Sequence, residues 1–230
     1  MAKWPLSFRK TVQSAWTVLT NGYMIGFFQG KIYNGKLKNL CVPGLNCYSC
    51  PGSLGSCPIG SLQAVLGSAK YQISFYLLGF FLLVGTVLGR LVCGFLCPFG
   101  LVQELLYKIP FVKKIRTFRL DRPLRWLKYI ILLVFVILLP LFVVDAAGTG
   151  SLFQWKLVIL ITTVLLSILI YRPFCKYICP LGAIYALFNK VSIYRYHVDP
   201  HTCTDCKQCE KACPMQISPM REANHAECIR

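Results

Sequence analysis

The residues of this chain best suited to chemistry are its cysteines: thirteen of the 230 residues are cysteine, and most stand at short, regular spacings. One pattern occurs twice. The segment RLVCGFLCPFG begins at Arg90 and returns as RPFCKYICPLG at Arg172, so arginine, both cysteines, proline and glycine recur at an offset of 82 residues. A shorter echo, CPIG, begins at Cys57. Because paired thiolates bind metal ions and iron–sulfur clusters, these spacings indicate such a site.

The proline after the second cysteine of each copy predicts the start of a helix, because the first helical turn does not need the missing N–H. The cysteine before it would lie at the positive helix end, which favours the thiolate. Two such pairs would supply four thiolates for one [4Fe–4S] cluster, with Arg90 and Arg172 offsetting its negative charge. The alternatives are a tetrathiolate zinc site and buried small hydrophobic side chains, and the repetition favours the cluster. The predicted ligands are Cys93, Cys97, Cys175 and Cys179.

Near the C-terminus, the sequence CTDCKQCEKACP has the bacterial ferredoxin spacing C-x2-C-x2-C-x3-C-P. We name it the ferredoxin run. It predicts that Cys203, Cys206 and Cys209 bind one [4Fe–4S] cluster, and that Cys213 serves a neighbouring one. Cys228 looks like the first cysteine of a second run. The fourth ligand of the first cluster is then either a residue beyond Arg230, or Cys213 or Cys228.

Four more cysteines lie in a segment rich in glycine and proline, which we name the cysteine-rich loop. Two interpretations stay open: another [4Fe–4S] cluster, which the CPIG echo favours, or two disulfides in an oxidising compartment. The cysteines of the loop are Cys41, Cys47, Cys50 and Cys57. In total, the sequence predicts two to four [4Fe–4S] clusters.

The composition predicts where these cysteines are held. Hydrophobic residues make up 56% of the chain and charged residues 14%, and the net charge is +17. These values disfavour a disordered tail, a secreted hydrolase and a typical nucleotide-binding enzyme. Uncharged stretches at 11–30, 71–89, 129–144 and 157–171 predict four transmembrane helices. The positive-inside rule then places both termini in the cytoplasm and the cysteine-rich loop on the outer face, and it accounts for the basic charge without nucleic acid.

The predicted fold is therefore an all-α integral membrane protein of a prokaryotic cytoplasmic membrane, with four transmembrane helices and a small C-terminal ferredoxin-like cytoplasmic segment. Its expected parts are residues 1–70, with the first helix and the outer loop; residues 71–190, with the membrane core and both repeats; and residues 191–230, with the iron–sulfur segment.

The two repeat copies at predicted span ends, followed by the ferredoxin run, resemble the membrane polyferredoxin family. That family includes the membrane quinol-dehydrogenase subunit of periplasmic nitrate reductase systems, and related nitrous-oxide-reductase maturation and cytochrome-oxidase assembly proteins. The resemblance covers about Tyr71 to Cys213. It implies a four-helix membrane core with [4Fe–4S] clusters, and it matches by position the eight cysteines of the two repeats and the ferredoxin run.

Three functions follow as hypotheses. The leading one is an electron-transfer protein, a subunit of an oxidoreductase complex, that relays electrons between a cytoplasmic donor or quinol pool and an extracytoplasmic acceptor. The second is a menaquinol or ubiquinol dehydrogenase subunit. The third is a redox-sensing or metal-reducing assembly factor. The expected partners are the lipid bilayer, other subunits of a redox complex, a flavin- or cluster-bearing extracytoplasmic protein, a cytoplasmic ferredoxin and quinone.

Overall fold

The computed structural model describes residues 6–46, 50–67, 75–110, 114–115, 121–142, 150–194, 196–199, 201–215, 217–220 and 224–229. Its regular structure in these residues is helical, as the all-α prediction requires, and the strand-like pairing is one bridge between Cys41 and Ser56. In chain order the elements are α1 (Leu6–Thr20), α2 (Ile25–Gln29), η1 (Lys36–Asn39), α3 (Pro58–Gly67), α4 (Phe75–Leu88), α5 (Leu91–Phe95), α6 (Pro98–Tyr107), α7 (Asp121–Leu124), α8 (Leu127–Ile131), η2 (Leu132–Leu138), α9 (Leu139–Phe142), α10 (Gly150–Leu169), η4 (Phe174–Ile178), α11 (Pro180–Phe188) and α12 (Gln208–Ala212).

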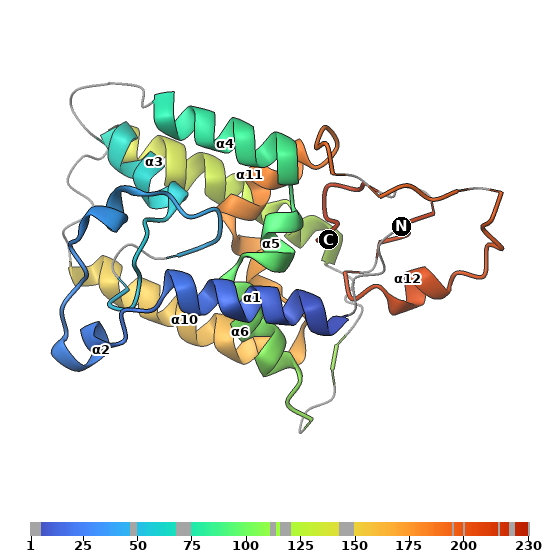
Figure 1. The fold of residues 1–230 in the computed structure, drawn as a ribbon, viewed down its shortest axis with the longest axis horizontal. Coiled ribbons are helices and arrows are strands. Elements are labelled where there is room, and N and C mark those ends of the chain that lie inside the picture. Colours follow the sequence, from blue (N-terminus) through green and yellow to red (C-terminus); the bar gives the residue numbers. More distant parts are fainter. Residues whose placement is uncertain are drawn as a thin grey trace.

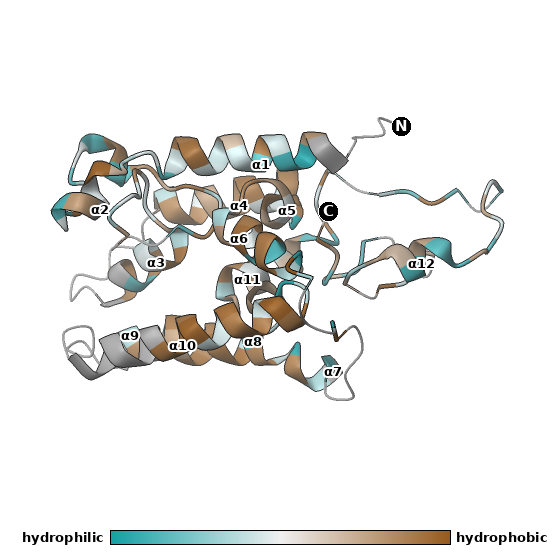
Figure 2. Cartoon of the chain, turned by 90° about the horizontal axis from the view of Figure 1, so that it is seen from below, coloured by the Kyte–Doolittle hydropathy of each residue, from teal (hydrophilic) through white to brown (hydrophobic). Residues whose placement is uncertain are grey.

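The longer helices pack into one body, and the ferredoxin run extends from it (Figure 1). On one side, α6 packs against α1 and α10. On the other, α11 packs against α4, α8 and η2, and α3 packs against η2 and α9. The segment with α12 reaches away from these helices at the right of Figure 1. Figure 2 shows hydrophobic residues along α8 and α10 and more hydrophilic ones at α12.

The predicted transmembrane architecture is wrong. Within the described residues, no helix combines the length and the apolarity that crossing a bilayer requires. The second predicted span yields α4, whose 14 residues measure about 21 Å, against about 30 Å of hydrocarbon. The third is divided among α8, η2 and α9, and the first between α1 and α2. This finding overturns the predicted four-helix membrane core and the predicted cytoplasmic-membrane localisation.

Each repeat copy begins where a longer helix ends and the chain turns through a left-handed residue. After α4 the residue is Gly89, with φ of 53°, and after α10 it is Arg172, with φ of 47°. A non-glycine residue in this region is strained and depends on its surroundings to hold it there. A short helical segment then follows, α5 or η4, and a new helix starts at the proline of the CPxG sequence, α6 or α11.

Candidate functional site

The second cysteine of each repeat caps the helix that follows, as the sequence predicts. Cys97 precedes α6 and its Sγ accepts the backbone N–H of Gly100 at 3.4 Å. Cys179 precedes α11 and accepts from Gly182 at 3.3 Å. The echo has a similar local arrangement, since α3 begins at the proline after Cys57. The CPxG sequence thus holds a sulfur at a helix N-terminus, where N–H groups stabilise negative charge.

The four repeat cysteines are all buried, with 4–7% of their surface exposed. The neighbouring thiol of Cys175, together with the N–H groups of Leu45 and Gly100, outweighs burial and lowers the pKa of Cys97 to about 6. The pKa of Cys175 is correspondingly raised. Burial is the main cause that raises the pKa of both Cys93 and Cys179. At Cys179 desolvation thus outweighs the N–H of Gly182, and at Cys93 it outweighs the nearby cations.

The two repeats exchange their arginines. The guanidinium of Arg172, from the second repeat, lies over Gly100 of the first, where an added Cβ would stand 3.3 Å from Arg172 Cζ. Arg90, from the first repeat, lies by Gly182 of the second, where an added Cβ would stand 3.5 Å from Arg90 Nη2. Arg172 Nη1 also donates to the carbonyl of Cys93 at 2.7 Å. Each CPxG glycine therefore lies against the arginine of the other copy, more tightly at Gly100 than at Gly182.

Each repeat arginine is ion-paired to a carboxylate that bridges to a second cation. Glu104 lies 2.9 Å from Arg172 and 2.6 Å from Arg9, and it also accepts from the hydroxyl of Tyr171. Burial favours the neutral carboxyl, but the neighbouring cations and the Tyr171 bond outweigh it and lower the pKa of Glu104. The side chain is therefore a carboxylate at neutral pH.

On the other repeat, Glu227 has the same role. It lies 3.2 Å from Arg90 and pairs with Lys128, and both cations are fully buried. The pKa of Glu227 is lowered because these cations outweigh the cost of burial. Arg90 Nη1 donates to Ala226 O at 2.7 Å, so the C-terminal segment that carries Glu227 is bound to the first repeat.

The arginine donors provide a test of whether these residues fit an anionic cluster. In the described structure Nε and Nη2 of Arg90 and Nε of Arg172 are buried without a hydrogen-bond partner. Such donors are costly unless something accepts from them, and the sulfurs of a thiolate-bound [4Fe–4S] cluster are suitable acceptors. No three histidine, cysteine or acidic side chains of the described residues converge on a single ion. A [4Fe–4S] cube is larger than an ion and takes more widely spaced sulfurs, so the buried donors and thiols fit the cluster.

The cysteine-rich loop lies against the first repeat. Gly44 is so close to it that a Cβ there would stand 2.4 Å from the carbonyl oxygen of Leu96. The hydroxyl of Tyr185, on α11, donates to Pro43 O at 3.0 Å. Within the loop, the backbone bridge between Cys41 and Ser56 brings Cys41 close to Cys57. These two cysteines are buried and Cys50 is half-buried.

The buried core places Cys41 and Cys57 with Cys93 and Cys179. Cys41 and Cys50 have free thiols, and Cys47 lies outside the described residues. A cluster on this loop stays a prediction.

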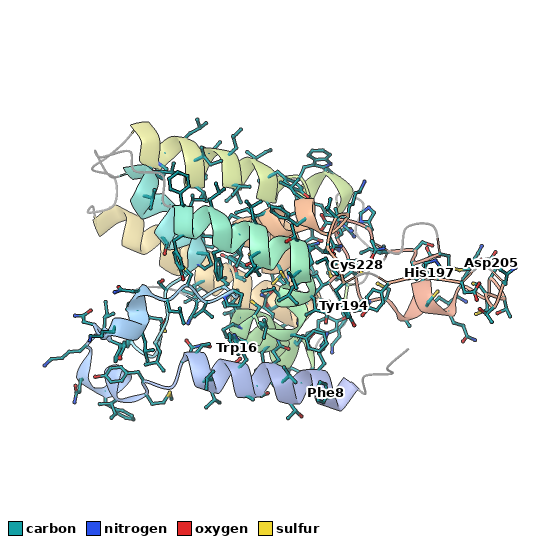
Figure 3. All side chains as sticks on the ribbon, turned by 45° about the horizontal axis from the view of Figure 1, so that its top comes forward. Phe8, Trp16, Tyr194, His197, Asp205 and Cys228 are labelled. Atoms are coloured by element: carbon teal, nitrogen blue, oxygen red, sulfur yellow. The ribbon has the colours of Figure 1, made fainter. Side chains whose placement is uncertain are left out.

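The ferredoxin run lies on the extension. Cys206 and Cys209 are exposed and Cys203 and Cys213 are half-buried. Figure 3 shows Asp205 and His197 out on this extension, and Cys228 where it meets the helical body. Its link to the body includes the 3.2 Å bond from Arg125 to Met215 O.

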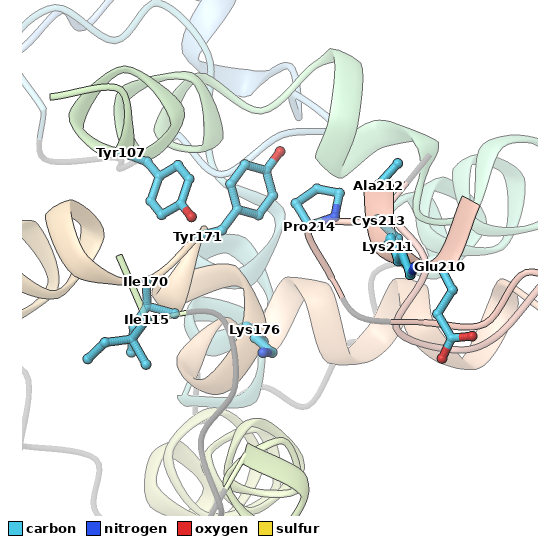
Figure 4. Close-up of a pocket in the computed structure, with 10 residues that line it drawn as sticks. All are labelled: Tyr107, Ile115, Ile170, Tyr171, Lys176, Glu210, Lys211, Ala212, Cys213 and Pro214. Atoms are coloured by element: carbon cyan, nitrogen blue, oxygen red, sulfur yellow. The ribbon is translucent and has the colours of Figure 1, made fainter. Parts of the chain in front are cut away.

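A cavity of about 460 Å³ separates the run from the repeats (Figure 4). Tyr107 and Tyr171 line it edge to face, with ring centroids 5.5 Å apart. Lys176, the neighbour of Cys175 in the second repeat, and Cys213, the last cysteine of the run, line the same cavity. The cavity therefore adjoins both predicted cluster sites.

Sequence reasoning missed the residues that support the thiols. Glu104 reads as an isolated acid near a span end, and Glu227 has no motif around it. Gln103 left a faint signal, since Gln63 stands at the same place after the CPIG echo. Its Nε2 donates to Cys175 Sγ at 3.4 Å and its Oε1 accepts from Phe174 N at 3.1 Å, so it joins the two repeats.

Comparison with known proteins identifies the cofactor. A family model described as a 4Fe-4S binding domain matches residues 72–119 and 152–195, which contain both repeat copies. The chain is an iron–sulfur protein. It binds [4Fe–4S] clusters, as the cysteine spacings predict. The matched residues end before the ferredoxin run.

Three relatives illustrate the similarity. An uncharacterized protein of Methanocaldococcus jannaschii is 32% identical over 155 residues, which are 65% of this chain and 61% of that protein. YccM of Escherichia coli, named for electron transport, is 29% identical over 60% of this chain and 44% of its own. The methylamine utilization ferredoxin-type protein MauN of Methylobacillus flagellatus is 26% identical over 59% and 51%.

This chain thus spans less than two thirds of the length of each of these three relatives, from 44% to 61%. No solved structure matches it. Together, the matches support an iron–sulfur electron-transfer protein.

Proposed function

We propose that this chain relays single electrons between a [4Fe–4S] cluster on the exposed ferredoxin run and a buried one held by both repeats. The observation that carries the proposal is the buried set of four repeat thiols, faced by arginine donors that have no other partner. When bound, a [4Fe–4S] cluster supplies one-electron oxidation and reduction at a potential set by its hydrogen bonds and its exposure.

The chain's own residues would create two different environments. Around the repeats, burial excludes water, and the N–H groups of Gly100 and Gly182 orient two of the four sulfurs. On the ferredoxin run, Cys206 and Cys209 are exposed, so a redox partner can approach a cluster there. Cys213, from the run, and Lys176, from the second repeat, line the same cavity. Electrons would therefore enter or leave at the extension and pass to the body.

The proposal is tested with anaerobically reconstituted protein, by iron and acid-labile sulfide per chain and by EPR of the reduced state. Two clusters correspond to about eight iron atoms per chain. Cys179→Ala should remove one cubane signal and about half of this iron, whereas Cys206→Ala should remove the other signal. A wild-type protein that retains a single cluster, or a Cys179→Ala variant that retains both, would contradict the proposal.

The cavity favours a second candidate function, the oxidation of a quinol. Two tyrosine rings in edge-to-face contact and the ammonium of Lys176 could hold an aromatic ring with polar oxygens. Oxidation of one quinol releases two protons and two electrons, one for each proposed cluster. Menaquinol should then reduce the clusters of the wild-type protein under anaerobic conditions. Tyr107→Leu should slow this reduction but not reduction by dithionite; equal rates in both proteins would refute this function.

A further inference from the structure

The two buried carboxylates, Glu104 and Glu227, stand in corresponding places around the repeat thiols. Each pairs with one repeat arginine and with one further cation. They come from unrelated parts of the chain, since Glu104 is on α6 and Glu227 follows the ferredoxin run. Nothing in the sequence repeat requires this similarity, because the repeat contains neither carboxylate.

The charges of these groups match those of a cluster. Four cations and two carboxylates form the two networks, so the networks carry two net positive charges. An oxidised [4Fe–4S] cluster, with two positive charges, held by four thiolates carries two net negative charges. Adding one electron leaves one negative charge that these networks do not balance. Any change in the network charge should therefore alter how readily the cluster accepts an electron.

We propose that Glu104 and Glu227 are positioning residues that set the reduction potential of the repeat cluster. They hold Arg172 and Arg90 beside the thiols, and they cancel half of the positive charge of the surrounding cations. This inference rests on the proposed function, because it requires a cluster on the repeats. It adds that the potential depends on a carboxylate supplied by the C-terminal segment.

The direction of each effect follows from the charge removed. Glu104→Gln and Glu227→Gln retain the shape of the side chain but leave three net positive charges, which favour the reduced cluster. Arg9→Gln leaves one net positive charge and disfavours it. Arg9 is partly exposed, with 18% of its side chain accessible, so solvent screens its charge and the effect should be smaller. Structural damage alone would not give opposite signs at the two members of one ion pair.

The experiment is a redox titration of the reconstituted full chain, followed by EPR of each cluster. Either Glu→Gln variant should shift the reduction equilibrium of the repeat cluster about tenfold toward the reduced state, which is about 59 mV upward for one electron. Arg9→Gln should shift it downward by about threefold. Glu210→Gln, an exposed carboxylate on α12, is the matched control and should leave the repeat cluster unchanged.

The outcomes separate this inference from the proposed function. Absence of a repeat-cluster signal in the wild type would refute both. A wild-type signal with shifts below twofold in Glu104→Gln and Glu227→Gln, or with shifts of one sign in Glu104→Gln and Arg9→Gln, would refute the inference alone. If a Glu→Gln variant fails to assemble, the sign and size of the Arg9→Gln shift decide.

Discussion

The exchange of arginines between the repeats predicts that the two CPxG glycines respond differently to the same substitution. A Cβ at Gly100 would lie 3.3 Å from Arg172 Cζ and Nη1, which is tighter than ordinary contact. Arg172 cannot easily withdraw, since it is fully buried and bound to Glu104 and to the carbonyl of Cys93. A Cβ at Gly182 would meet Arg90 Nη2 at 3.5 Å, which is ordinary van der Waals contact.

The magnitude follows from two opposing contributions. Replacing a helical glycine by alanine stabilises a helix by about 0.5–1 kcal/mol. Overpacking of a buried site costs about 1–3 kcal/mol. Because Gly100 and Gly182 occupy the same position in their helices, the first contribution cancels in the comparison. We expect Gly182→Ala to be neutral or slightly stabilising, and Gly100→Ala to unfold more easily than it by about 1–2 kcal/mol.

The assay is urea unfolding of reconstituted protein without oxygen, followed by far-ultraviolet circular dichroism. Gly79→Ala provides the control, because Gly79 lies in α4 with nothing within 4 Å of its Cβ position and should gain the helix contribution alone. A Gly182→Ala variant as unstable as Gly100→Ala, or more unstable, would refute the proposed difference in arginine packing.

Three further perturbations follow from buried contacts. Asp121→Asn should lower the free energy of unfolding by about 1–3 kcal/mol at pH 7, because Asp121 pairs with Lys176 and Arg125. Neighbouring cations and hydrogen bonds outweigh burial and lower the pKa of Asp121. The difference in stability from wild type should therefore shrink as the pH falls through that pKa, and a difference that stays constant would contradict this explanation. Gly44→Ala should push the cysteine-rich loop off the first repeat and speed alkylation of its thiols in the apoprotein, measured by mass spectrometry; unchanged labelling would show that the loop does not close there. Tyr185→Phe should lower the free energy of unfolding in urea by about 1 kcal/mol, because the hydrogen bond to Pro43 O is lost. An unchanged free energy of unfolding would show that this bond does not stabilise the folded protein.

What the sequence predicted well is local. Proline directly after cysteine determines where α6 and α11 begin, and it does so through the backbone geometry of two adjacent residues. The helical character of the chain and the [4Fe–4S] cofactor were likewise indicated by composition and spacing.

The failures concern length and distance. Apolar stretches predicted four spans, but the helices that the structure describes there are short or divided: α4 has 14 residues, and the third stretch is divided among α8, η2 and α9. Hydropathy does not register such divisions. The cysteine-rich loop was expected on the outer face, whereas Gly44 lies against the first repeat. Glu227 could not be found in advance, because it meets Arg90 from 137 residues away and no spacing rule connects them.

The arginine exchange has a consequence for how such a molecule could be divided. Each copy contains an arginine that packs against the glycine of the other copy. A fragment ending between α6 and α10 would therefore contain Arg90 without Gly182, and Gly100 without Arg172. A chain with a single copy could form these contacts by pairing with a second chain, with the arginine of each against the glycine of the other. The present chain has both partners on one polypeptide, which makes their ratio invariably one to one.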